Sequence, residues 1–338
     1  MKPAGLRARF LRQKGTLVGL ALVLALMAFA AAGPWVSGHD PFASDFQRGI
    51  AGELPVGPSR EFWLGTDRIY RDQLVRLAYG ARLSLLIGLM ATAIASVIGG
   101  AVGIVAGFFE GGRGLRIPWL SVAAFVASVA LLPRSIPLSL GLFGAAVIGV
   151  LAAQITGKAP LGAFELNLDQ SLMSFVDVGL SFPFMLLVMA VGASFEHTSV
   201  TTILVTLGLT GWLGTARIVR AKTLEVRNRE FVLAARALGQ STPRILVMHV
   251  LPNVRGPLLA IATLSVAQMI LAESVLSYVG AGVSPPTPTW GHMLFEGQEV
   301  FGAAPWLFLG PAGFILIAVF GFNLLGEGLR HALDRSDR

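Results

Sequence analysis

The sequence predicts an all-α polytopic protein that crosses a membrane about eight times. Hydrophobic residues make up 54% of the 338 residues and charged residues only 13%, whereas a soluble domain carries about 25% charged residues. Apolar runs of about 20 residues, long enough to span a bilayer as a helix, alternate along the chain with short charged segments. The composition argues against a water-soluble globule, because too few charges are present to cover its surface.

The charge and the lack of cysteine exclude other classes. The chain contains no cysteine, which rules out a disulfide-stapled fold and a cysteine-ligated zinc or iron–sulfur centre. Its formal net charge is +7, but the basic side chains occur in short runs between apolar segments. Such runs are typical of the cytoplasmic loops of membrane proteins. We therefore expect the chain to lie in a lipid membrane and to bind no nucleic acid.

The N-terminal segment predicts a retained membrane helix and an external loop. Residues 1–14 are basic without any acid, and residues 15–33 are apolar. This run is longer than the roughly 7–15 residues of a signal-peptide core, so a cleaved signal peptide is only the alternative. Residues 1–33 are therefore predicted to be a cytoplasmic N-terminus and the first span. Residues 34–82 are expected outside, with an interfacial amphipathic helix over 69–85 that leads into the next span.

Residues 83–326 form the predicted transmembrane domain. Its expected spans cover residues 83–109, 117–132, 137–156, 175–194, 198–218, 256–282 and 306–325. With the first helix they number about eight, and an even count places the N-terminus and the tail 327–338 together in the cytoplasm. The pair over 117–156 is broken by Pro133 and Pro137. Its short first half leaves a re-entrant pair as the alternative.

Three glycines in the second span, Gly99, Gly103 and Gly107, recur at every fourth position. This spacing lets another helix approach closely. Glycine is also generally common in membrane helices, so the sequence leaves both interpretations open.

Glu273 is the clearest ionisable residue inside a predicted span. Such residues are rare in membranes and often functional. Glu273 could hold a proton or cation, or accept structural hydrogen bonds, and the lack of a second acid or base nearby favours the structural interpretation. Asp177, near the inner end of its span, can reach water and is also expected to be structural.

The sequence carries no enzyme motif. It lacks a P-loop, an H-E-x-x-H motif and a G-x-S-x-G motif, and its five histidines show no ligand spacing. We expect no catalytic residue, no metal site and no cofactor bound by this chain.

The basic segment 217–255 is expected in the cytoplasm. Within it, Asn228 predicts the start of a short helix and Gly239 its end. Thr242 and the following proline predict a second helix, which Pro252 ends. On the first helix, one apolar stripe is predicted from Phe231, Ala234, Ala235 and Leu238. A short amphipathic helix of this kind fits a groove on a cytoplasmic partner. The alternative is a helix that lies on the membrane surface.

These residues carry a resemblance to a known family. The segment resembles the E-A-A-x3-G-x9-hydrophobic-x-L-P loop of ABC importer permeases, matching it at Ala234, Ala235, Gly239, Leu251 and Pro252. Leu233 stands where the family usually has Glu. More narrowly, the chain resembles the C-type subunits of the dipeptide/oligopeptide/nickel permeases. The further matching segments are LGTD (64–67), RD (71–72), YGARLSL (79–85), DVGLSFP (177–183), FVLAARALG (231–239), HVLPN (249–253), ESVLSYVGAGVSPPTPTWG (273–291), APW (304–306) and FNLLGEGLRHALD (322–334).

Two departures from the family are visible. Tyr70 precedes Arg71 and Asp72 where the family has a Gly-Arg-Asp run. Residues 115–165 resemble an insertion into a six-helix core, so the predicted hairpin would raise six spans to eight.

The resemblance implies a binding-protein-dependent importer in a bacterial inner membrane, for peptides or a related solute such as nickel. A homologous second permease would complete the pathway, and an external solute-binding protein would deliver the solute to the outer loops. Two cytoplasmic ABC ATPases would hold ATP and Mg, and each would take a coupling helix, here about 229–238, into a groove. The residues assigned to this interface are Arg229, Glu230, Phe231, Leu233, Ala234, Ala235, Arg236, Leu238, Gly239, Leu251 and Pro252.

A secondary transporter or channel working alone is the alternative function. It would require inverted repeats and several buried polar groups near the membrane midplane, and the sequence shows no convincing repeat. A membrane-embedded enzyme would need a cluster of catalytic polar residues, which the sequence does not show. Dependence of uptake on ATP distinguishes the importer from the secondary transporter.

Overall fold

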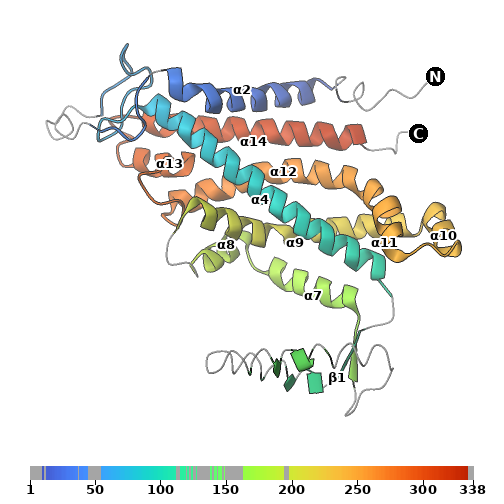
Figure 1. Cartoon of the computed structure of the whole chain (residues 1–338). Helices are drawn as coiled ribbons and strands as arrows, with labels where there is room; N and C mark the ends of the chain where they lie inside the picture. The colour runs from blue at the N-terminus through green and yellow to red at the C-terminus, as the bar shows by residue number, and fades with distance from the viewer. Residues whose placement is uncertain are drawn as a thin grey trace, which may run out of the picture.

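The computed structural model describes residues 13–36, 38–44, 55–111, 115–118, 163–193 and 198–333, with Phe10 and isolated positions between 120 and 148. In this part of the chain, long helices lie side by side in a bundle (Figure 1). The helices of the bundle are α2 (Lys14–Val36), α4 (Gln73–Phe109), α7 (Leu168–Ser181), the short α8 (Phe184–Gly192), α9 (Val200–Arg227), α12 (Leu251–Tyr278) and α14 (Trp306–Leu333). The shorter elements are β1 (Leu115–Pro118), β2 (Ala163–Leu166), α10 (Glu230–Ala237), α11 (Thr242–Ile245), the π-helix η1 (Leu246–Val250) and α13 (Trp290–Gln298).

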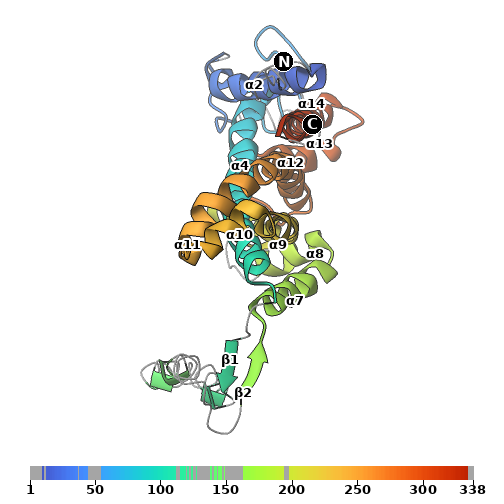
Figure 2. The same ribbon diagram turned by 90° about the vertical axis from the view of Figure 1, so that its right-hand side faces the viewer.

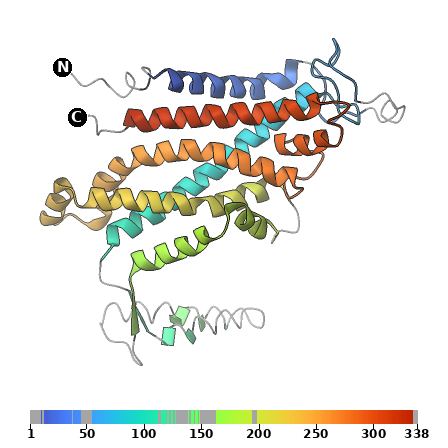
Figure 3. The same ribbon diagram turned by 180° about the vertical axis from the view of Figure 1, so that it is seen from behind.

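The bundle has two ends, which we name the α10 end and the α13 end after the short helices found there (Figures 1 and 3). The start of α2 and the end of α14 both lie at the α10 end. Five described helices are long and apolar enough to cross a membrane, and the bent pair α7–α8 brings the number to six if it forms one span. The described residues therefore show five or six candidate spans rather than the expected eight.

The predicted hairpin over 117–156 lies almost entirely outside the described residues and stays a prediction. Its first two positions belong to β1 and not to a helix. β1 pairs antiparallel with β2, with Leu115 opposite Leu166 (Figure 2). An antiparallel pair returns the chain to where it left, so α7 starts at the α10 end, where α4 stops.

α4 and α9 pack closely along the three glycines noted in the sequence. A Cβ at Gly99 would lie 2.6 Å from the carbonyl oxygen of Trp212, and one at Gly107 would lie 2.7 Å from that of Arg220. Such distances leave no room for any side chain. Close packing of the two helices, and not the general abundance of glycine in membrane helices, therefore explains why glycine recurs at every fourth position here.

The largest apolar cluster joins α2, α4, α12, α13 and α14. Trp290 lies at its centre, fully buried, and its indole Nε1 donates a hydrogen bond to the carbonyl oxygen of Leu77 at 3.1 Å. Buried tryptophan usually finds such a partner for its N–H. The opposite faces of the helices expose apolar side chains such as Val97 and Leu316, which suits contact with lipid.

Two expected helices differ in the structure. The expected span 175–194 is split into α7 and α8, which meet at an angle of 94°. Pro183 explains the break, because it has no N–H to donate and it forces the preceding Phe182 into an extended conformation (φ −86°, ψ 138°). The amphipathic helix expected over 69–85 starts later than predicted and is continuous with the next span. Asp72 caps one helix of 37 residues, α4, which covers both.

Candidate functional site

The loop at the α10 end begins where α9 stops. Asn228 stays attached to α9 through its N–H, which donates to the carbonyl oxygen of Val226, so Arg229 and not Asn228 is the N-cap of α10. Gly239 ends the helix as predicted, with φ at +74°. Its N–H donates to the carbonyl oxygen of Arg236 at 3.0 Å. Glycine adopts this left-handed conformation without the strain a Cβ would add.

The second helix of the loop does not end at Pro252, where it was expected to end. Ser241 is the N-cap of α11, and the chain continues through η1 into α12, with Pro252 in the first turn of α12. The turn before Pro252 widens, so that Leu251 N–H donates to the carbonyl oxygen of Leu246, five residues earlier. A widened π turn accommodates the missing N–H of proline within a helix.

α10 buries one face and exposes another. Val232 and Ala235 are buried in an apolar cluster that also contains Phe108 of α4, Val226 of α9 and Ile245 of α11. The predicted stripe is therefore wrong at Ala235, because that side chain points into the protein, whereas Ala234 is exposed. Leu233 is half exposed. The exposed apolar side chains of this loop are Phe231, Leu233, Leu238, Val247, Met248 and Leu251. We call these six residues the apolar loop surface.

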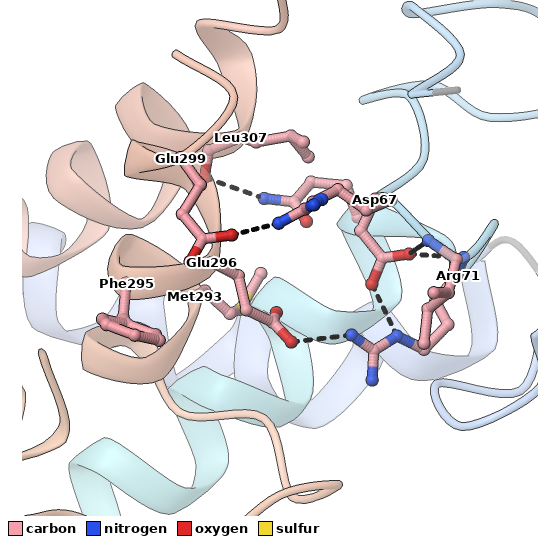
Figure 4. A pocket seen from close by; sticks show the side chains of 11 residues that line it. Asp67, Arg71, Met293, Phe295, Glu296, Glu299 and Leu307 are labelled. Carbon is pink, nitrogen blue, oxygen red and sulfur yellow. Dashed lines mark hydrogen bonds and ion pairs between the residues drawn. The ribbon is translucent and has the colours of Figure 1, made fainter. Parts of the chain in front are cut away.

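Charged side chains gather at the α13 end in what we call the ionic cluster, namely Asp67, Arg71, Arg76 and Glu296 (Figure 4 shows three of them). The guanidinium of Arg71 lies 2.5 Å from Asp67 Oδ2 and 2.8 Å from Glu296 Oε1. Arg76 is fully buried, and its Nη2 donates to Glu296 Oε2 at 2.6 Å. The cluster thus ties the loop before α4, and α4 itself, to α13.

A cavity of 340 Å³ lies beside the ionic cluster. Its lining includes Gln73, Met293 and Phe295, and the exposed ion pair of Arg68 with Glu299 also borders it (Figure 4). Burial alone would raise the pKa of Glu296, but hydrogen bonding from His292 and the positive charges of Arg76 and Arg71 outweigh burial and lower this pKa to about 2. The carboxyl group is therefore a permanent anion at neutral pH.

Tyr70, where the chain departs from the Gly-Arg-Asp run of the family it resembles, has a backbone conformation that favours glycine. Tyr70 has φ at +67°, and it is the only non-glycine residue with positive φ among the residues the structure describes. This conformation costs an L-residue about 1–2 kcal/mol but costs glycine little. The ring of Tyr70 contacts that of Phe62 edge-on, with centroids 5.2 Å apart, which offsets part of this cost.

Glu273 is fully buried in α12, near its α13 end. Its carboxyl oxygens accept hydrogen bonds from the hydroxyl groups of Ser84 on α4, at 3.0 Å, and Ser277 on α12, at 2.8 Å. Ser84 Oγ also accepts from the N–H of Trp290 at the start of α13, at 3.4 Å. Glu273 therefore lies at a joint between three helices, and no ion pair joins it to a basic residue in the described ranges.

The remaining candidates lie apart from these sites. Asp177 forms an ion pair with Arg217 of α9, and both side chains are more than half exposed. Arg76 and Glu296 were not anticipated from the sequence. The spacing of Asp72 and Arg76 by four residues, and of His292 and Glu296 by four, is the only local signal that could have indicated them.

Comparison with known proteins decides the family. A family profile described as "Binding-protein-dependent transport system inner membrane component" matches residues 145–336, more than half of the chain. The chain belongs to this family. A second profile, "N-terminal TM domain of oligopeptide transport permease C", matches residues 6–53. The chain is thus a transport subunit of a multi-pass inner-membrane permease, and it is not an enzyme.

The relatives extend over nearly the whole chain. The oligopeptide transport system permease protein OppC of Bacillus subtilis is 32% identical over 96% of this chain and 87% of its own length. OppC of Salmonella typhimurium is 31% identical over 98% of this chain and 90% of its own. The dipeptide transport system permease protein DppC of Bacillus subtilis is 32% identical over 96% and 83%. A solved MetNI methionine ABC transporter chain matches at 17% identity with a TM-score of 0.42, over 75% of this chain and 97% of that chain.

Proposed function

We propose that this chain is one of two homologous permeases in an ATP-driven importer of short peptides. The similarity to oligopeptide and dipeptide permeases over almost the whole chain supports peptides as the solute, rather than nickel. An external binding protein delivers the peptide, and two separate ATPases hold ATP and Mg. The division of the chain is the one expected from the sequence, with the external loop 34–82, the transmembrane domain 83–326, which includes the insertion 115–165 and the loop 217–255, and the tail 327–338.

The α10 end faces the cytoplasm in this proposal. The described basic residues concentrated there support this orientation, since cytoplasmic loops are enriched in Lys and Arg. They are Arg217, Arg220, Lys222, Arg227, Arg229, Arg236, Arg244, Arg255 and Arg330. Both termini are then cytoplasmic, and the α13 end, with the ionic cluster, faces the binding protein.

The apolar loop surface is the observation that carries the coupling role. Its six large apolar side chains are exposed on a loop that the proposed orientation places in water. Exposed apolar patches of this kind mark interaction sites, and a short amphipathic helix binds a groove through such a face. We assign α10, with the interface residues predicted from the sequence, as the coupling helix. Ala235 contributes from within, by anchoring α10 in the apolar cluster around Phe108. Leu233 makes the ATPase contact apolar where the family usually has Glu.

Substitution of Ala234 tests the coupling role. Ala234→Glu places a charge among the apolar contacts and should lower ATP-dependent peptide uptake by at least roughly tenfold, because burying an unpaired charge costs several kcal/mol. Ala234→Ser, which keeps the side chain small, should leave uptake nearly unchanged. Gly239→Pro should also abolish uptake, because proline cannot adopt φ at +74°. Uptake of a mixture of di- to pentapeptides into proteoliposomes that contain the complete transporter gives the readout. Normal uptake by both Ala234→Glu and Gly239→Pro at normal protein levels would refute the assignment.

A further inference from the structure

Arg227 joins the loop at the α10 end to the last turn of α4. It is the final residue of α9, and its Nη1 donates hydrogen bonds to the carbonyl oxygens of Gly107 (3.2 Å), Phe108 (3.2 Å) and Glu110 (2.8 Å). The last carbonyl groups of a helix have no partner within the helix, and a positive charge there is favourable. Arg227 therefore caps α4 from a neighbouring helix.

Arg236 makes a second connection, from α10 itself. Its guanidinium carbon lies 4.6 Å from the centroid of the Phe108 ring, within the range of a cation–π interaction. Val232 and Ala235 of the same helix belong to the buried cluster that contains Phe108. α10 thus contacts the end of α4 directly through Arg236, while Val232 and Ala235 share the apolar cluster around Phe108 with side chains of α9, α11, η1 and α12. We call Arg227, Arg236 and Phe108 the clamp.

Packing alone does not fill the space around the clamp. A cavity of 400 Å³ is lined by all three clamp residues together with Gln240 and Ile245. Arg227 of α9 and Arg236 of α10 both border this opening, so on this side Arg236, and not close packing, holds α10 against α4, and Arg227 holds the junction before α10 to α4. Without the clamp, α10 would be held mainly by Val232, Ala235 and its two connecting turns.

α4 reaches from the clamp to the opposite end of the bundle. A helix of 37 residues is about 55 Å long, and the glycine face packs α4 tightly on α9. At the α13 end, Arg76 of α4 is bonded to Glu296 of α13. One continuous helix therefore touches both the proposed coupling helix and the ionic cluster.

We propose that α4 transmits the movement of α10 to the α13 end, and that Arg227 and Arg236 are the positioning residues that make α4 follow α10. The proposal rests on the coupling role of α10 given above. A force that ATPase closure applies to α10 reaches α4 through the clamp and moves α13 through the bond of Arg76 to Glu296. Loss of the clamp loosens the junction of α9 and α10 from the last turn of α4, so that less of the movement of α10 reaches α4 and fewer peptides are imported per ATP hydrolysed.

The test measures peptides imported per ATP hydrolysed. The variants are Arg227→Gln, Arg236→Gln and their conservative counterparts Arg227→Lys and Arg236→Lys. Arg244→Gln is the matched control, because Arg244 is exposed on the neighbouring α11. The complete transporter is reconstituted in proteoliposomes with the binding protein and the peptide mixture, and phosphate release and co-purifying ATPase subunits are measured alongside.

We expect both Gln variants to retain their ATPase subunits and a hydrolysis rate within about twofold of the original, while import per ATP falls roughly tenfold, within the range of measured coupling effects. Both Lys variants should import as many peptides per ATP as the original protein, because lysine also donates to carbonyl groups and lies over aromatic rings. If a Gln variant does not assemble, Phe108→Leu removes the ring and keeps both arginines, and it should show the same loss of import per ATP.

Import per ATP equal to that of Arg244→Gln in the Gln variants or in Phe108→Leu would overturn the clamp, as would failure of the Lys variants to restore import. Ala234→Glu separates this failure from that of the coupling role. If Ala234→Glu loses its ATPase subunits while the clamp variants behave like the control, only the clamp is wrong. If Ala234→Glu also keeps normal import per ATP, the coupling role and the clamp both fail.

Discussion

At the residue scale, the ionic cluster depends on one carboxyl group. Glu296 is the shared partner of Arg71 and of the fully buried Arg76. A buried guanidinium without an anion is strongly destabilising. Glu296 therefore both neutralises the end of α4 and fixes α13 to it.

The lowered pKa of Glu296 predicts a pH-dependent contribution to stability. Because the pKa falls from 4.5 to about 2 on folding, ionised Glu296 stabilises the fold fully above pH 4.5. This contribution fades as the pH falls from 4.5 towards 2, where the folded protein also takes up the proton. Glu296→Gln should lower the free energy of unfolding by about 3 kcal/mol at pH 7 and by much less at pH 3. Thermal unfolding in detergent at both pH values gives the comparison.

Glu299→Gln is the control for that measurement. Glu299 pairs with Arg68 at the surface, and both side chains are about half exposed. Exposed pairs contribute about 0–1 kcal/mol, so this variant should differ little from the original at either pH. A Glu296→Gln effect that is equal at pH 7 and pH 3 would contradict the account of the cluster.

At position 70 we expect glycine to give a more stable protein than alanine, which reverses the usual order. Glycine normally destabilises a position relative to alanine, but at φ of +67° alanine retains the strain that glycine lacks. Tyr70→Ala should therefore be less stable than Tyr70→Gly by about 1 kcal/mol, since both lose the contact with Phe62. Unfolding of the two variants side by side tests this order. A more stable Tyr70→Ala would show that the left-handed conformation is wrong.

Single residues show what the sequence could predict. Gly239 as a helix end followed from its own conformational freedom, which is a local property. The bond of Arg76 to Glu296 joins residues 220 positions apart, and no local pattern encodes such a pairing. Ala235 was placed on the exposed stripe, because helical spacing gives the faces of a helix but not which face meets the protein.

At the element scale, the spans were predictable where an apolar run meets no interruption. α4, α9, α12 and α14 follow from hydropathy alone. The break between α7 and α8 was missed, although Pro183 was visible, because proline also occurs within intact membrane helices. Pro252, by contrast, was expected to end a helix and does not, because the widened turn before it lets the chain continue as α12.

The close packing of the α4 glycines on α9 predicts that the same substitution, glycine to leucine, will lower stability much more on α4 than at an open position of α9. Gly103→Leu would drive its side chain into α9, because even a Cβ added at Gly103 would lie only 2.8 Å from the Cβ of Val219. We expect a loss of about 3 kcal/mol in the free energy of unfolding. A Cβ at Gly214 on α9 would meet no atom of another element within 4 Å, so Gly214→Leu should cost far less. The two midpoints of thermal unfolding give the readout, and equal midpoints would count against close packing of α4 on α9.

At the scale of the whole molecule, the described helices connect two surfaces of different chemistry. One end presents the apolar loop surface, and the other presents the ionic cluster and its cavity. α4 and α12 each run between these ends, and the joint around Glu273 fixes them to one another beside α13. A protein built in this way suits a subunit that responds to a partner on one side of a membrane and acts on the other.

The proposed function requires partners, because it makes this chain one permease of an ATP-driven peptide importer. The most direct test is purification of the tagged chain from its native membrane in mild detergent, with the co-purifying proteins identified and counted. We predict one related permease and two copies of an ABC ATPase for each copy of this chain. A chain that purifies alone, or only with copies of itself, and that still moves peptides on an ion gradient would contradict the claim.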